Sequence, residues 1–215
     1  MAEVKEINNL EQLNELGRAQ EIDLTKDNKL VREIVGNLKK TIRKKNILAL
    51  SAPAIGYNKR IFCIDYADNE IKTYINPVIS NYEELELSRE VCTSIPDKEF
   101  VRPRNGVIDV IYQTPTGKIN SKRFNGVAAH IFQHEVDHLN GVTLEDIGLE
   151  IEKDFDEASE EERQEIINMY LDSLDIRQKK LDEIIEEDEE LSLINDRLKF
   201  TEALARGDIK LEQID

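Results

Sequence analysis

This chain of 215 residues has only two cysteines, and it has no tryptophan and no long apolar run. Two cysteines are too few for the disulfide framework that stabilises many small secreted domains. No apolar run approaches the roughly 20 residues that a membrane-spanning helix requires. The first residues also lack the basic and then apolar segments that are typical of a secretory signal. We therefore expect a cytoplasmic protein without a membrane partner.

Basic residues are fewer than acidic ones. The chain has 29 Lys and Arg against 45 Asp and Glu, which gives a net charge of −16. Direct binding of nucleic acid requires clustered positive charge, so this total predicts no nucleic-acid partner. The acidic excess is uneven, because residues 151–215 hold 22 acidic and 9 basic residues, a net charge of −13. We predict one domain over residues 1–150, with a net charge of only −3, and an acidic extension over residues 151–215.

Hydrophobic residues make up 40% of the chain, and their spacing predicts both helices and strands. Apolar residues recur every fourth position within 26–45, which predicts an amphipathic helix. Short runs rich in β-branched and aromatic residues, bounded by turn residues, predict strands at 60–65, 72–79, 107–112 and 118–124. The helical period returns over 127–139. Because helices do not regularly separate the strands, we expect an α+β fold rather than a parallel sheet.

The acidic extension also has helical features. Ser159 and Glu162 stand at the spacing of a capping box, and an apolar stripe follows from Ile167 to Leu191. We expect one or two surface helices here, with the acidic run 186–190 in a solvated loop or at a helix end. A coiled coil with a protein partner is the alternative, although few clean heptads support it.

One helix of the predicted domain carries a metal-binding pattern. His134, Glu135 and His138 form an H-E-x-x-H motif, in which two imidazoles lie one helical turn apart and can bind one divalent ion. Glu135 follows the first histidine and could exchange a proton with a water activated by that ion. The alternative is an ordinary surface helix. Apolar neighbours such as Phe132 and Val136 indicate burial, which favours the metal site because buried polar groups need partners.

Two further residues of this helix have competing interpretations. His130 lies one turn before the motif, and three successive turns cannot easily reach one ion, so we expect a packed or hydrogen-bonded side chain there. Asp137 could orient a ligand or pair with a neighbouring cation. A third metal ligand is also required. Cys92, in a polar segment, is a better candidate than Cys63, which lies in an apolar strand and is expected to be a core residue.

Three segments now resemble the motifs of one known family. Residues 90–94, Glu-Val-Cys-Thr-Ser, resemble the E-G-C-L-S motif of peptide deformylases. Residues 132–141 are similar to the family's F-Q-H-E-x-D-H-L-x-G, and residues 50–56 resemble the end of its G-x-G-L-A-A-x-Q motif with the glycine that follows. Asn76-Pro77 resembles its I-N-P strand. The resemblance covers about residues 26–147 and implies antiparallel sheets around the helix that carries the histidines.

The resemblance also implies a role for each matching residue. Cys92, His134 and His138 would bind one divalent metal per chain, Fe²⁺ in many members and Zn²⁺ or Ni²⁺ in others, and Glu135 would be the general acid and base. The implied reaction is hydrolysis of the N-formyl group from the initiator methionine of a new polypeptide. A formylated peptide would be the substrate.

Several positions depart from the family pattern. Ile47 and Ala49 stand where the family has glycines, and Ala54 replaces a glutamine that helps to position the formyl oxygen. Val91 replaces a glycine beside the metal cysteine. Thr93 replaces a leucine, but its backbone N–H could still donate to an oxyanion. The metal-binding residues are thus complete, whereas the predicted substrate pocket, which includes Ala49, Ala54 and Val91, is altered.

We therefore predict a divergent, deformylase-like metallohydrolase, whose activity is reduced if the altered pocket impairs substrate positioning. One alternative is a hydrolase with the same mechanism and a different N-acyl peptide substrate. Another is a non-catalytic metal-binding protein on the same scaffold. The extension 151–215 could bind a protein partner or pack on the domain.

Overall fold

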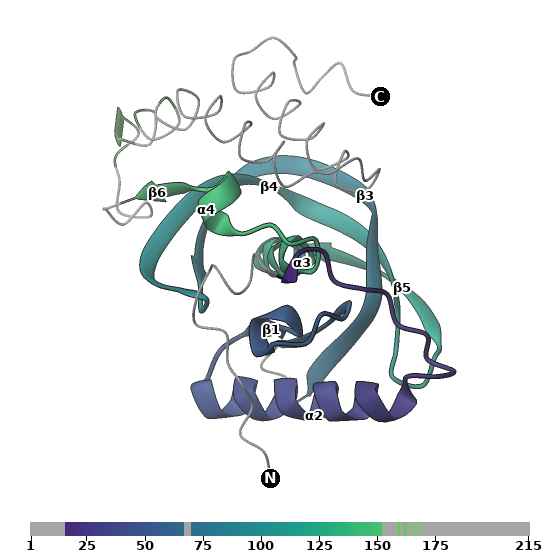
Figure 1. Ribbon diagram of the computed structural model, residues 1–215. Coiled ribbons are helices and arrows are strands. Elements are labelled where there is room, and N and C mark those ends of the chain that lie inside the picture. Colours follow the sequence, from purple (N-terminus) through teal and green to yellow (C-terminus); the bar gives the residue numbers. More distant parts are fainter. Residues whose placement is uncertain are drawn as a thin grey trace. The chain divides into compact units, whose positions relative to one another are not determined.

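The computed structural model describes residues 16–66 and 70–151, together with residues 159, 161, 162, 165 and 168 (Figure 1). In chain order the elements are α2 (Asn28–Lys45), β1 (Ala49–Ser51), the 3₁₀ turn η1 (Pro53–Ile55), β2 (Ile61–Asp65), β3 (Ile71–Cys92), β4 (Ile95–Gln113), β5 (Ile119–Asn125), α3 (Val127–Leu139), α4 (Leu144–Ile147) and β6 (Leu149–Ile151). The predicted order of helix, strands and helix is confirmed. In the part of the chain described, no helix is long and apolar enough to cross a membrane.

The strands form one antiparallel sheet in the order β1-β2-β3-β4-β5, with β6 beside β4. The predicted antiparallel sheet is therefore confirmed, and the fold mixes α and β elements. β3 and β4 are much longer than the predicted runs 72–79 and 107–112. The middle of β3 is mostly exposed, so little apolar alternation marks it as a strand in the sequence.

Alternation along β2 separates two hydrophobic cores on opposite faces of the sheet. Ile61 and Cys63 belong to the core that also contains the buried face of α2. Phe62 and Ile64 point to the other face and belong to the core that contains Phe132 of α3. α2 packs against β1 and β2, whereas α3 packs against β1, η1 and β5 (Figure 1). The sheet therefore holds the histidine-bearing helix in place from the side opposite α2.

Aromatic side chains dominate the core beneath α3. The rings of Phe62 and Phe132 meet edge to face with centroids 4.9 Å apart, and Tyr74 meets Phe132 edge to face at 5.1 Å. The ring of Phe124, from β5, lies 5.2 Å from that of Phe132. Such pairs stabilise a core beyond the burial of their area and restrict the position of the helix they contact.

A smaller group of contacts surrounds α4 and β6. Residues 99–101 of β4 pair with residues 149–151 of β6. Lys98 Nζ lies 3.1 Å from Glu145 Oε1 and 2.9 Å from Glu150 Oε2. Thr143 begins α4 with a capping box, in which its N–H and hydroxyl both donate to the carboxylate of Asp146.

Few residues of the predicted extension are described. Ser159 N donates to Glu162 Oε2 at 2.8 Å, and Glu162 N donates to Ser159 Oγ at 3.3 Å, so the predicted capping box is confirmed. The apolar stripe that begins at Ile167 and the acidic run 186–190 lie outside the described residues. The boundary between residues 1–150 and 151–215 stays a prediction.

Candidate metal centre

Hydrogen bonds hold α3 at its middle and at its C-terminal end. The side chain of Gln133 accepts a hydrogen bond from Asn105 N at 3.1 Å and donates one to Asn105 O at 2.8 Å. At the C-terminal end, Arg60 Nη1 donates to Asn140 Oδ1 at 2.8 Å and to Leu139 O at 3.3 Å. These bonds hold the helix immediately before His134 and after His138.

Arg60 is a buried neighbour of α3 that the sequence patterns did not reveal. Its side chain is 4% exposed, and burial lowers the pKa of its guanidinium to about 10, so it remains charged near neutral pH. A cation at the C-terminal end of a helix is favourable because the helix dipole places partial negative charge there. Nothing in the strand that begins after Arg60 marks this role, because the contact joins residues about 80 positions apart.

His134 and His138 direct the same ring atom towards each other. Their Nε2 atoms are 3.1 Å apart, and the two rings are nearly perpendicular at 84°. Two nitrogen ligands on a tetrahedral ion with bonds of about 2.0–2.1 Å would be about 3.3 Å apart. The observed separation is close to that value, so the helix places the two imidazoles as a metal-binding pair.

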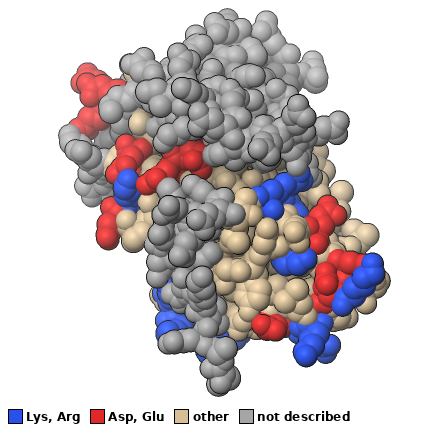
Figure 2. Space-filling view, viewed as in Figure 1, with Lys and Arg blue, Asp and Glu red and all other residues tan. Residues whose placement is uncertain are grey.

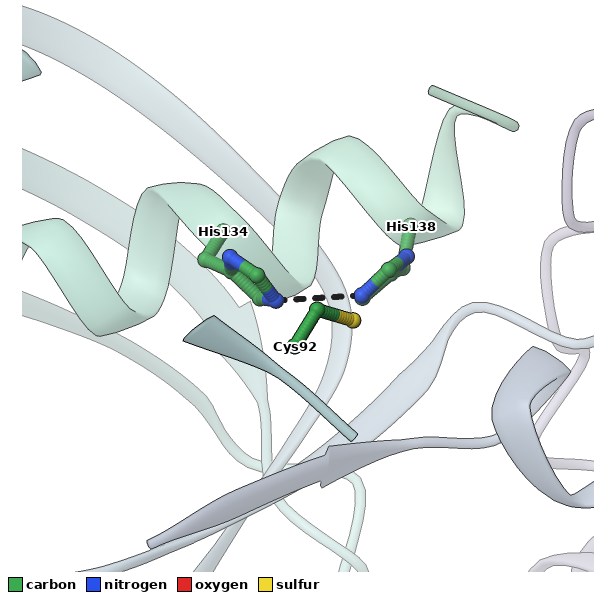
Figure 3. Close-up of side chains that lie close together, drawn as sticks. All are labelled: Cys92, His134 and His138. Atoms are coloured by element: carbon green, nitrogen blue, oxygen red, sulfur yellow. Dashed lines mark hydrogen bonds between the residues drawn. The ribbon is translucent and has the colours of Figure 1, made fainter. Parts of the chain in front are cut away.

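Cys92, the last residue of β3, brings its sulfur to the same two rings (Figure 3). The possible ligand atoms of Cys92, His134 and His138 all lie within 4.8 Å of one another. One thiolate and two imidazoles are a donor set that suits Zn²⁺ and Fe²⁺. The residues present therefore fit a divalent metal.

Glu135 lies between the two histidines in the sequence and is 4% exposed. On a helix, residues three apart are neighbours on the surface, so Glu135 and His138 occupy adjacent positions. A carboxylate buried here is costly unless other groups compensate its charge. A cationic centre at the neighbouring imidazoles would supply that compensation.

The other two candidate residues of α3 are explained by contacts. His130 Nε2 lies 2.7 Å from Glu86 Oε1, so its ring packs against a carboxylate, as expected for a residue that is not a ligand. Asp137 Oδ2 accepts a hydrogen bond from Arg104 Nη1 at 2.6 Å, so the neighbouring-cation interpretation is observed. The Arg104 side chain is only 2% exposed, which makes this ion pair part of the interior.

Cys63 is a core residue, as predicted. Its side chain is fully buried, and its sulfur lies 3.5 Å from Thr73 Oγ1. Burial raises the pKa of the Cys63 thiol to about 11, which keeps it protonated near neutral pH. A thiol held neutral in this way is a poor metal ligand.

The predicted pocket residues occupy different surroundings. Ala54, in η1, is buried in the core on the α2 side, and Ala49 of β1 is half-buried and packs against the core on the α3 side. Val91 is 65% exposed, and Thr93 is exposed in the turn between β3 and β4. Val91 does not adopt a positive φ, so a valine in place of glycine is not strained at this position. Their assignment to a substrate pocket stays a prediction.

The family model of polypeptide deformylase matches residues 5–152, more than half of the chain. This chain belongs to the polypeptide deformylase family. The predicted resemblance to deformylases is thereby confirmed, and the cysteine and histidine positions of the candidate metal centre fall within the matched region.

Individual deformylases show the extent of the similarity. The chain is 36% identical to the peptide deformylase of Dictyoglomus thermophilum over 120 residues, which is 56% of this chain and 78% of that protein. It is 35% identical to the peptide deformylase of Thermosynechococcus vestitus over 121 residues, 54% of this chain and 64% of that protein. The chain thus spans less than two thirds of the length of this second deformylase. The crystal structure of peptide deformylase from Thermotoga maritima matches with a TM-score of 0.62 and 29% identity, covering 68% of this chain and 98% of that one.

Proposed function

We propose that this protein is a metal-dependent amide hydrolase that removes the N-formyl group from the initiator methionine of nascent polypeptides. The observation that carries the proposal is the convergence of Cys92, His134 and His138, whose ligand atoms lie within 4.8 Å of one another. The buried carboxylate of Glu135 beside this group supports a catalytic rather than a purely structural centre, because a structural site needs no group to transfer protons.

The three ligands would hold one divalent ion, with Fe²⁺ as our first choice and Zn²⁺ or Ni²⁺ as alternatives. When bound, such an ion acidifies water and polarises a carbonyl group. Glu135 accepts the proton of the attacking water and returns it to the leaving amine. The backbone N–H of Thr93 donates a hydrogen bond to the oxygen that becomes negatively charged.

In this proposal residues 1–150 form the catalytic domain. Residues 151–215 form a helical, acidic extension that is available to a protein partner. The formylated peptide is the substrate, and we place the reaction in the cytoplasm.

Formate release tests this function directly. We expect full-length protein, loaded without air with Fe²⁺ and separately with Ni²⁺, to release formate from formyl-methionyl peptides. Acetylated copies of the same peptides serve as the control for selectivity. Absence of formate with both metals, in protein whose metal content is one per chain, would rule out deformylation.

Ala54, which stands where the family has a glutamine, allows a second test of the proposed function. An alanine has no side-chain donor, and loss of one oxyanion donor typically lowers turnover by about 10²–10³. We expect Ala54→Gln to raise formate release by about tenfold or more, with the change mainly in kcat. Ala52→Gln, at another buried alanine nearby, is the control for added bulk. If Ala54→Gln leaves kcat unchanged in folded, metal-loaded protein, the missing amide does not limit the reaction.

The same residue supports a second candidate substrate. Ala54 is smaller and less polar than glutamine, and Val91 adds bulk that is 65% exposed next to Cys92. These changes favour a hydrolase with the same mechanism and a different N-acyl group. Assay of a series of N-acyl peptides separates this possibility from deformylation, and inactivity towards all of them would favour a non-catalytic metal-binding protein.

A further inference from the structure

The helix α2 is strongly basic in a chain whose net charge is −16. It contains one acidic residue, Glu33, and seven basic residues: Lys29, Arg32, Lys39, Lys40, Arg43, Lys44 and Lys45. All of the basic residues except the half-buried Lys39 are exposed. At 3.6 residues per turn, Lys29, Arg32, Lys40 and Arg43 lie on the side of the helix opposite its buried stripe. Figure 2 shows Lys and Arg side chains at both ends of the region where Figure 1 labels α2.

Helix stability does not account for this charge. Cations in the last turn are favoured by the helix dipole, which explains Arg43 and Lys44. Lys29, however, lies in the first turn, where a positive charge is disfavoured and where α2 has no acidic residue. Lys40 and Lys44 are four residues apart, so their like charges repel and destabilise the helix by a few tenths of a kcal/mol.

The charges of Lys40, Arg43 and Lys44 are also not neutralised by the part of the chain that the structure describes. Within the described residues, no carboxylate forms an ion pair with Lys40, Arg43 or Lys44. The single acidic side chain of the helix, Glu33, accepts a hydrogen bond from Tyr57 Oη at 2.9 Å. Within the described residues, the cationic face therefore carries charge that no carboxylate compensates.

The composition of this face indicates which polyanion it suits. Protein interfaces are depleted in lysine and enriched in aromatic residues. The exposed residues of α2 include no aromatic or large aliphatic side chain, and they are residues 28, 29, 32, 33, 36, 40, 43, 44 and 45. Lysine and arginine without stacking aromatics suit a phosphate backbone, which is bound by charge and not by reading bases.

We propose that the exposed face of α2 binds the phosphate backbone of RNA through Lys29, Arg32, Lys40, Arg43 and Lys44. We choose RNA as the source of the phosphate groups, and this choice rests on the proposed function. The substrate of that function is a nascent polypeptide, which is made beside RNA. The net charge of −16 does not prevent such contact, since screening limits the acidic field to about 10 Å at 0.1 M salt. The expectation of no nucleic-acid partner rested on the net charge of the whole chain, which does not reveal the local positive charge of α2.

Fluorescence anisotropy of a labelled 20-nucleotide oligouridine with the full-length protein tests the proposal without measuring hydrolysis. If about four phosphates are contacted, the logarithm of the affinity should fall with a slope of about −3 against the logarithm of the salt concentration. Affinity should therefore drop about 50-fold between 50 and 200 mM salt. Absence of binding at 50 mM salt would overturn the proposal and leave the proposed hydrolysis untouched.

A pair of charge-matched variants locates the binding face. Lys40→Glu with Lys44→Glu should weaken binding by about tenfold or more, because two phosphate contacts become repulsive. Lys118→Glu with Lys122→Glu makes the same change in net charge at exposed positions outside α2 and should cost less than about threefold. Equal losses in the two variants, both checked for folding by circular dichroism, would show that only the total charge matters and would overturn the assignment. Binding to phosphatidylglycerol vesicles with the same variant dependence, together with no binding to oligouridine, would instead identify an anionic lipid surface and reject RNA.

Discussion

Glu135→Gln is expected to lower kcat/KM for formate release by about 10²–10⁴ while the protein keeps its metal. The glutamine has nearly the same shape, so it fits the buried position between His134 and His138, but it cannot accept and return a proton. The measurements are formate release from a formyl-methionyl peptide and metal content by elemental analysis. Loss of activity with metal retained is the expected result, because the carboxylate is not one of the three candidate ligands.

The control for this variant is Glu70→Gln, which removes an exposed carboxylate that pairs with Lys72 at the start of β3. It should leave kcat/KM unchanged within about twofold, since surface substitutions rarely alter distant chemistry. Activity of Glu135→Gln within threefold of the parent protein would contradict the assignment of Glu135 as the group that transfers the proton. Loss of the metal from Glu135→Gln would also contradict this assignment. Glu135 would then stabilise the metal centre and not only transfer the proton.

Arg104→Met is expected to lower the free energy of unfolding by about 3–5 kcal/mol. The Arg104 side chain is 2% exposed and that of Asp137 is 13% exposed, with Nη1 and Oδ2 only 2.6 Å apart. Removal of the guanidinium leaves the carboxylate of Asp137 in the interior without the cation that offsets its charge. Guanidinium chloride unfolding of the full-length protein measures the change.

Two further variants make this test specific. Adding Asp137→Asn to Arg104→Met should recover part of the lost stability, because an amide carries no charge to compensate. Arg123→Met breaks a comparable contact with Asp109 at 3.1 Å, but its side chain is 52% exposed, so we expect a loss below about 1 kcal/mol. If Arg104→Met and Arg123→Met lowered the free energy of unfolding by the same small amount, burial of the Arg104–Asp137 pair would make no difference to its contribution to stability.

Local patterns in the sequence predicted the helices well. The predicted helix 127–139 has the same bounds in the structure, and the predicted helix 26–45 is observed as Asn28–Lys45. Helical periodicity depends on neighbours within a few residues, so it can be identified without knowledge of the rest of the fold. The i, i+4 spacing of His134 and His138 likewise placed two imidazoles side by side, as the structure has them.

Strand extent was predicted less well. β3 continues from the predicted run 72–79 to Cys92, and β4 begins at Ile95, far before the predicted run 107–112. The added residues are polar and largely exposed in the middle of β3, so their extended conformation depends on hydrogen bonds to a neighbouring strand. Pairing of this kind depends on partners distant in the sequence and leaves only a weak local pattern.

The sequence by itself determined the family resemblance and the helix that carries the histidines, since the H-E-x-x-H spacing requires only one helix and the deformylase motifs require only their order. It also contained the seven cations of α2, although the total charge concealed them. Only the tertiary structure decided which cysteine approaches the histidines, with Cys63 in a core and Cys92 within 4.8 Å of them. It alone revealed that Arg60 and Arg104 are buried against the end of α3 and against Asp137. The physical reason is that helical periodicity is a local property, whereas burial and the convergence of side chains arise only when distant segments pack together.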